Sequence, residues 1–212
     1  MIYDWRNFLT KWSKEILEFD EFRKAFSAEV ITSGWFGYPG ASEEEINMVE
    51  TRLGILLPPS YREFLQVTNG WPWGGFFVER MLSTREIEWY AKDNQDGIDI
   101  WVASQETDPT DEEYFVYNDT QIEGYFRARY LQTALQICAI YDDNVFLLNP
   151  QVVTSTGEWE AWFFAPWLPG ARRSRSFWDL MQEEYKIFLY LRSSIYEKKG
   201  DFYYLKSEQI TS

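Results

Sequence analysis

The sequence predicts an α+β fold in which consecutive antiparallel strands lie between helices at the two ends of the chain. Apolar residues recur at helical spacing near both ends, whereas the middle holds short apolar runs separated by turn residues. Strands and helices do not alternate as they would in βαβ units, and no internal repeat is visible. With 212 residues, 45% of them hydrophobic, the chain is long enough for one compact domain with its own core.

The first predicted element is an amphipathic helix over residues 3–26. Large apolar side chains, among them Trp5 and Trp12, recur there mostly at steps of three and four, with charged residues between them. We interpret residues 1–30 as an N-terminal helical extension. Three glycines and a proline in segment 33–40 then predict a loop or short linker.

Two short helices follow, and both have clear boundary signals. Ser42 and Glu45 have the spacing of a capping box, and Gly54 stands where a left-handed C-terminal cap is expected. The second helix is predicted to begin at Pro59, because proline in a first turn loses no needed hydrogen bond. Residues 69–70, Asn-Gly, end it.

The middle of the chain has weaker patterns, and its elements are short. From short apolar runs we expect strands at 76–78, 98–102 and 114–117. A Ser83–Glu86 capping box predicts a short helix through Tyr90. Between these elements we expect a polar loop at 93–97 and a solvated acidic segment at 106–113.

The second half of the chain predicts more sheet and one long helix. Apolar runs at 135–140 and 145–148 flank an Asp-Asp-Asn turn and form a β-hairpin candidate. A third run at 158–164 would extend the sheet. Ser176 is the expected cap of a last helix that continues to Ile195.

Charge decides which partners the chain favours. Lysine and arginine total 20 against 34 acidic residues, so the net charge is −14. Such a surface repels nucleic acid and anionic lipid, whereas it attracts a basic protein and speeds its capture. We therefore expect a protein partner, no nucleic acid and no membrane contact.

Residue types that are missing or rare exclude several chemistries. Histidine is absent, which removes Ser-His-Asp and Cys-His nucleophilic schemes and histidine-based zinc sites. The only cysteine, Cys138, stands in an apolar run and is expected in the core, and a single cysteine fits a reducing compartment. The N-terminus shows no secretory signal and no run of 18 apolar residues occurs, so the cytoplasm is the expected location.

No catalytic residue, metal site or cofactor is predicted. Asp142 and Asp143 are explained by a turn. A calcium loop with Gly97 at its sixth position would require Lys92 as first ligand, which fails. The cluster Arg172, Arg173 and Arg175 could bind an anion, although a structural role, paired with the acidic surface, is the favoured interpretation.

The order of several short motifs resembles a known family. The motifs are Pro39-Gly-Ala-Ser-Glu-Glu-Glu-Ile46, Leu53-Gly54, Leu57-Pro-Pro-Ser-Tyr-Arg-Glu-Phe-Leu65, Thr68-Asn-Gly-Trp71, Leu147-Leu-Asn-Pro150, Gly157-Glu-Trp-Glu-Ala-Trp162, Trp167-Leu-Pro-Gly170 and Arg173-Ser-Arg-Ser-Phe-Trp178. This set resembles the SMI1/KNR4 (SUKH) family. The resemblance implies a twisted antiparallel sheet flanked by helices over residues 31–195, followed by a C-terminal tail at 196–212, and it implies no active site.

The resemblance also implies a function. Bacterial members of the family resemble immunity proteins that neutralise polymorphic toxins, often nucleases, whereas fungal members resemble regulators of cell-wall assembly and signalling. Because the chain lacks long low-complexity flanks, we favour an immunity protein, with a regulatory scaffold as the alternative. The partner would be a cognate toxin, basic where it binds nucleic acid. A monomer is favoured, although the oligomeric state stays open.

Exposed aromatic anchors and complementary carboxylates are expected at such an interface. Each aromatic residue could equally serve the core, and each acid could simply be solvated. The expected partner-binding residues are the aromatics Trp35, Tyr38, Trp71 and Trp73 and the acids Asp93, Asp96, Asp99, Glu106, Asp108 and Asp111.

Overall fold

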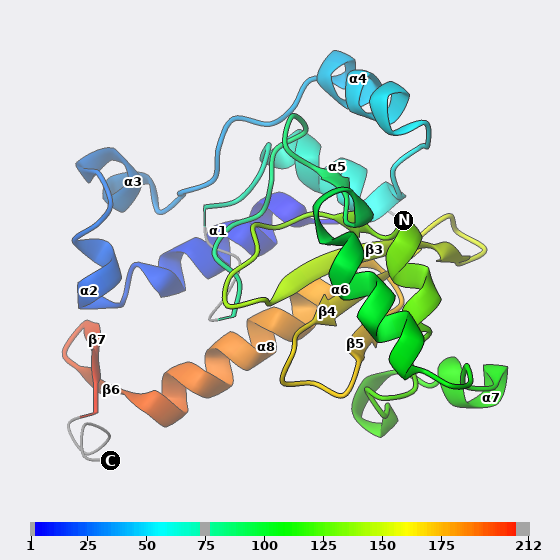
Figure 1. Ribbon diagram of the computed structural model, residues 1–212. Coiled ribbons are helices and arrows are strands. Elements are labelled where there is room, and N and C mark those ends of the chain that lie inside the picture. Colours follow the sequence, from blue (N-terminus) through cyan, green and yellow to red (C-terminus); the bar gives the residue numbers. More distant parts are fainter. Residues whose placement is uncertain (1–2, 73–76, 207–212) are drawn as a thin grey trace.

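The computed structural model describes residues 3–72 and 77–206. Its helices are α1 (Trp5–Ile16), α2 (Asp20–Arg23), α3 (Ala28–Ser33), α4 (Glu43–Leu53), α5 (Pro59–Val67), α6 (Ala91–Ser104), α7 (Asp111–Tyr114) and α8 (Phe177–Ile195), with the 3-10 helices η1 (Asn118–Thr120) and η2 (Ala128–Thr133). Its strands are β1 (Glu88–Trp89), β2 (Leu135–Gln136), β3 (Val145–Val153), β4 (Trp159–Phe164), β5 (Ala171–Ser174), β6 (Tyr196–Lys199) and β7 (Phe202–Leu205) (Figure 1).

Five of these strands form one antiparallel sheet in the order β1-β2-β3-β4-β5, so the predicted α+β class with its antiparallel sheet is confirmed. The predicted hairpin joins β2 to β3. Its tip is the turn Asp142-Asp143, closed by hydrogen bonds between Tyr141 and Asn144. Both aspartates have positive φ, 50° and 59°, a conformation that matches the twist of antiparallel strands.

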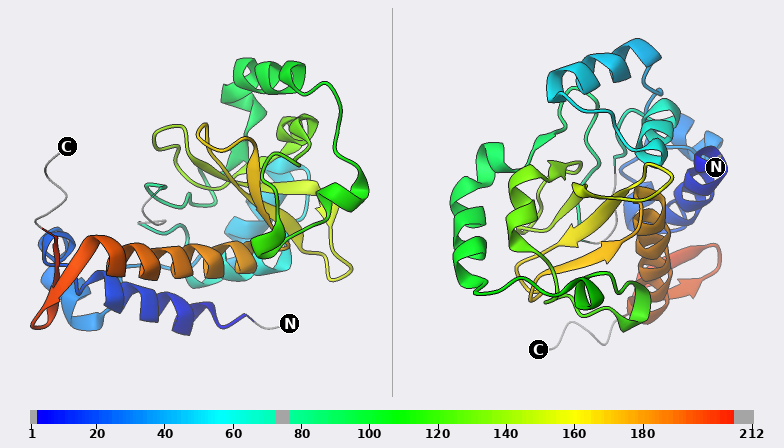
Figure 2. Two further views of the ribbon diagram at one scale, coloured as in Figure 1. Left: turned by 90° about the horizontal axis from the view of Figure 1, so that it is seen from below. Right: turned by 90° about the vertical axis from the view of Figure 1, so that its right-hand side faces the viewer.

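Helices cover both faces of this sheet. In the right-hand view of Figure 2, α6 lies on one side of the strands, and α8 and α1 lie on the other. Every residue of β4 is buried, because its sequence is apolar on both faces apart from Glu160. The sheet is therefore the middle layer of the domain.

The N-terminal helix is shorter than predicted. α1 ends at Ile16, and residues up to Ser33 form two further short helices. The reason lies at Phe19, whose extended backbone lets its ring stack on Tyr203 of β7 at 5.5 Å between centroids. The helix itself belongs to the main core, since Trp5 and Trp12 are fully buried in the same cluster as the sheet.

The helices with strong boundary signals are confirmed. The capping box between Ser42 and Glu45 forms at the start of α4, and Gly54 ends that helix at φ 72°. α5 begins at Pro59. The Ser176 hydroxyl accepts a hydrogen bond from the Asp179 amide and starts α8.

Five expectations for the middle of the chain are wrong. The predicted polar loop and strand at 93–102 are the helix α6, and 114–117 holds the end of α7 and no strand. At 83–86 the Ser83 hydroxyl does bond the Glu86 carboxylate, but the segment is a turn before β1 and starts no helix. Residues 77–78 form no strand, and Phe76 lies outside the described residues. Beyond the middle of the chain, residues 196–205, which belong to the predicted tail, form the hairpin β6–β7.

Candidate functional site

The most acidic part of the chain is α6 with the segment that follows it. Residues 91–113 hold eight acids and one lysine, a net charge of −7, which is half that of the whole chain. Ile98 anchors α6 in the core, and the side chains of Gln95 and Gln132 exchange hydrogen bonds of 2.9 Å that join the helix to η2. The acids are therefore displayed on a fixed element.

The six acids expected at the interface are all exposed, yet they differ in their partners. Asp108 pairs with Arg129 at 2.5 Å, and Asp111 pairs with Arg127. Asp99 accepts a hydrogen bond from Gln95. Among the residues that the structure describes, no cation lies within ion-pair distance of the other three, Asp93, Asp96 and Glu106.

Trp101, a half-buried residue of α6, lines two open hollows. One, of about 510 Å³, is lined by Asp93, Asp96 and the turn residue Asp143. The other, of about 520 Å³, is lined by Glu106 among others. The Trp101 ring meets two core phenylalanines edge to face, at 5.3 and 5.4 Å, so the wall shared by the hollows is rigid.

The expected aromatic anchors lie elsewhere, since none of those described lines either hollow. Trp71 is fully buried and packs at 5.3 Å against Trp35, so the expectation that Trp71 is an exposed anchor is wrong. Trp35 is half-buried beneath the Arg6 guanidinium. Tyr38 is exposed by 45%, and Trp73 lies outside the described residues.

The structure adds one aromatic residue that sequence reasoning missed. Trp167, in the loop between β4 and β5, is 54% exposed. Its indole donates a 2.9 Å hydrogen bond to the Asn144 side chain, and its ring packs on Phe77 and Phe163. The available signal was a tryptophan in a proline- and glycine-rich loop, where exposed functional residues concentrate.

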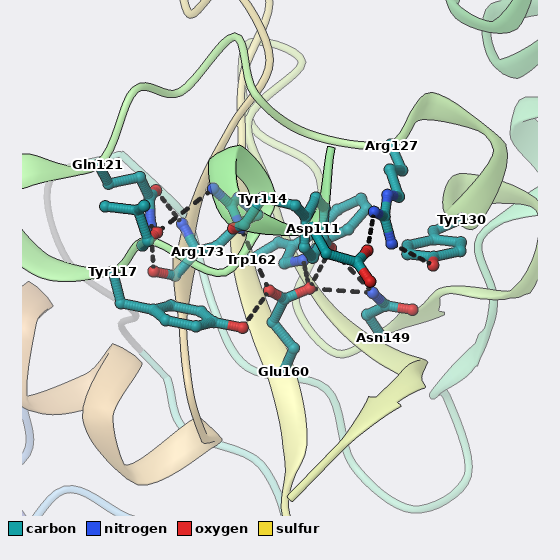
Figure 3. A network of polar contacts seen from close by, with 11 residues as sticks. Asp111, Tyr114, Tyr117, Gln121, Arg127, Tyr130, Asn149, Glu160, Trp162 and Arg173 are labelled. Atoms are coloured by element: carbon teal, nitrogen blue, oxygen red, sulfur yellow. Dashed lines mark hydrogen bonds and ion pairs between the residues drawn. The ribbon is translucent and has the colours of Figure 1, made fainter. Parts of the chain in front are cut away.

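In contrast to the exposed acids of α6, Glu160 lies inside the protein and belongs to a network of polar contacts (Figure 3). The carboxylate of Glu160 is fully buried and accepts hydrogen bonds from four neutral donors. They are the hydroxyls of Tyr114 at 2.5 Å and Tyr117 at 2.8 Å, the Asn149 amide at 3.0 Å and the Trp162 indole at 2.6 Å. Burial, and then Glu160 itself, raise the pKa of both tyrosines, which therefore stay protonated donors.

Of the predicted arginine cluster, only Arg173 belongs to this interior, while Arg172 is half-buried and Arg175 is exposed. Arg173 is fully buried, lies 3.6 Å from Glu160, and exchanges two backbone hydrogen bonds with the Gln121 side chain. Arg172 pairs with the buried Glu184 at 2.6 Å. Arg172 and Arg173 thus have the structural role that was favoured, although the acids they meet, Glu184 and Glu160, are buried and do not belong to the acidic surface.

Within the described residues, no group of three or more histidine, cysteine, aspartate or glutamate side chains is placed to hold a metal ion. Cys138 is a buried free thiol, and burial raises its pKa to about 12. Over that same part of the chain, no helix combines the length and the apolar character that a membrane crossing requires.

A model of the SMI1 / KNR4 family (SUKH-1) matches residues 40–188. The matched region contains the five-stranded sheet, both hollows and the Glu160 network, whereas α1 to α3 and the hairpin β6–β7 lie outside it. No curated protein matches the chain.

Proposed function

The chain belongs to the SMI1/KNR4 family, and from this premise we propose that it is an immunity-type protein that neutralises a cognate toxin by binding it. The observation that supports the proposal best is the largely exposed segment 91–113, which has half of the net negative charge. Its carboxylates Asp93, Asp96 and Glu106, which form no ion pair with any described residue, line hollows that a partner side chain can enter.

Electrostatics explains how such a protein would act. A toxin that cleaves nucleic acid needs a basic groove for its substrate, and an acidic surface competes for that groove. Long-range attraction also speeds capture, which matters when one toxin molecule can kill the cell. Neutralisation then requires tight binding and no turnover, so the proposed activity is not enzymatic.

Several further properties belong to this proposal. We place the protein in the cytoplasm, where a toxin would act, as a monomer that binds one basic toxin. Residues 31–195 would form the family domain, with 1–30 as an extension and 196–212 as a tail. Because α1 shares the main core, the extension would contribute stability as well as surface.

A regulatory scaffold is the second candidate. It is supported by exposed large side chains in two separate parts of the sequence, which are Met48 at 65% and Leu56 at 75% around α4, and Tyr190 at 69% on α8. A scaffold would bind several partners through different faces, each more weakly than an immunity protein binds its toxin.

Co-expression with the product of the adjacent reading frame tests the proposal. We expect the frame alone to kill the host and this chain to restore growth. The double variant Asp93→Asn/Asp96→Asn should protect less well. A matched control, Glu29→Gln/Glu44→Gln, removes the same charge from exposed positions on α3 and α4 and should protect fully. A toxic neighbour that the wild-type chain does not relieve would favour the scaffold.

A further inference from the structure

We infer that Trp167, the turn Asp142-Asp143 and the hollow beside α6 form one docking point for a cationic side chain and its apolar surroundings on the toxin. The inference rests on the proposed function and names the part of the surface that performs it. Trp167 would be the aromatic anchor, and the carboxylates of Asp93, Asp96 and Asp143 would receive the cation.

The charge balance of the hollow favours a cation. Three carboxylates from two separate elements line it, those of Asp93 and Asp96 from α6 and that of Asp143 from the hairpin turn. The lining cation, Lys92, is already paired with Glu88 at 2.9 Å. The ring of Trp101 forms part of the wall, and an aromatic ring adds to the attraction for a guanidinium or ammonium group.

Trp167 has the properties of a preordered anchor. More than half of its surface is exposed, although two rings and one hydrogen bond hold it in place. An anchor that is already ordered loses little side-chain entropy on binding, and tryptophan is enriched among residues that dominate interface energies. Its hydrogen-bond partner, Asn144, directly follows Asp143, so the anchor and the acidic hollow are physically joined.

Asp142 and Asp143 occupy a turn in which other residue types would make the folded protein more stable. Positions 142 and 143 both have left-handed backbone angles, for which Asn-Gly is the preferred pair, and two adjacent carboxylates also repel each other. Within the part of the chain that the structure describes, neither Asp142 nor Asp143 forms an ion pair that would offset these costs.

The negative charge of the hollow favours a basic protein as the partner that binds there. A second copy of this chain has a net charge of −14, and a nucleic acid is likewise anionic, so both are repelled by this surface. A basic protein surface with an exposed arginine or lysine beside apolar side chains fits both the hollow and Trp167.

Two variants test the inference against an inactivated form of the toxin encoded by the adjacent reading frame. Trp167→Ala should weaken its affinity about tenfold or more. Asp142→Asn/Asp143→Gly should weaken the affinity several-fold while raising the melting temperature, because the new turn is better suited to its conformation. Tyr190→Ala removes a still more exposed aromatic side chain, on α8, and as the matched control it should bind normally.

The possible results distinguish a failure of the docking point from a failure of the proposed immunity function. If the wild-type chain binds the toxin and all three variants bind equally well, the docking point is wrong while the proposed function stands. If the wild-type chain does not bind the toxin, both are overturned. Opposite changes of stability and affinity in the turn variant would support the inference directly, since a purely structural turn predicts no loss of affinity.

Discussion

Two sets of carboxylates in this molecule have opposite surroundings. Glu158, Glu160 and Glu184 are buried, and each accepts hydrogen bonds from donors that other segments of the chain supply. Asp93 and Asp96 on α6 are exposed and, among the described residues, have no cationic partner. The side chains are chemically alike, so their roles follow from the donors that the fold places around them.

The buried set must be matched because desolvating a charge is costly. A carboxylate removed from water regains that free energy only through good hydrogen bonds or a nearby cation. The exposed set keeps its hydration and its negative potential, and both are available to a partner. Buried acids therefore hold the fold together, whereas the exposed acids are the ones free to bind.

The largest expected effect follows from Glu160→Gln. The change leaves the buried Arg173 charge uncompensated and places an amide donor among donors, so the free energy of unfolding should fall by about 3–5 kcal/mol. Urea unfolding at pH 7 measures it. Asp96→Asn is the control from the exposed set and should change stability by less than about 0.5 kcal/mol. Equal effects of the two substitutions would remove the distinction between the sets.

A smaller loss is expected at Glu158. Its carboxylate accepts bonds from the Ser60 amide at 2.9 Å, the Ser60 hydroxyl at 2.6 Å and the Tyr3 hydroxyl at 2.8 Å, which join the N-terminus and α5 to the sheet. Glu158→Gln should cost about 1.5–3 kcal/mol. Tyr3→Phe removes one of the three bonds and should cost about 1 kcal/mol in the same unfolding assay. A greater loss from Tyr3→Phe than from Glu158→Gln would contradict this assignment.

Sequence reasoning succeeded where the signal is local. The capping box at Ser42, Pro59 at the start of α5, the Asp-Asp-Asn turn and the cap at Ser176 each act through atoms within a few residues. Their positions could therefore be predicted without knowledge of the fold.

Sequence reasoning failed where the local signal was misleading. α6 contains Gly97 and a kink at Asn94, whose backbone angles are not helical, so its first half has the composition of a loop. Its second half contains three β-branched residues, but Ile98 is buried while Ile100 is 69% exposed, which fits a helix, since residues two apart on a strand share a face. Packing on η2 outweighed local propensity here.

The candidate site was predictable only in part. The acids of 93–111 could be named because they are numerous and lie in polar surroundings. Asp108 and Asp111 pair with arginines that lie 21 and 16 positions further along the chain, in η2 and just before it. Asp93 and Asp96 meet no cation among the residues that the structure places, and the sequence near these four acids does not reveal the difference. Likewise, nothing near Glu160 in the sequence reveals Tyr114 or Tyr117, because these contacts span more than 40 residues.

The buried set should also respond to pH, through Glu184. Burial outweighs the opposing effect of Arg172 and raises the pKa of Glu184 to about 7 in the folded protein. The folded state therefore holds this proton more tightly than the unfolded state, so the contribution to stability is complete below about pH 4.5 and is lost as the pH rises towards 7. Relative to Glu184→Gln, the wild-type chain should lose about 1 kcal/mol of unfolding free energy per pH unit between pH 5 and 6. Parallel pH profiles of the two proteins would contradict this.

The smallest effect on stability, and the clearest effect on binding, is expected from Asp93→Asn/Asp96→Asn/Asp143→Asn. Because these carboxylates have no cationic partner among the described residues, the free energy of unfolding should change by less than about 0.5 kcal/mol per site. Stopped-flow association with the toxin should show a slower on-rate and a weaker dependence on salt, since the long-range attraction is reduced. An unchanged salt dependence would mean that the attraction comes from other acids, and a large loss of stability would place these residues with the buried set after all.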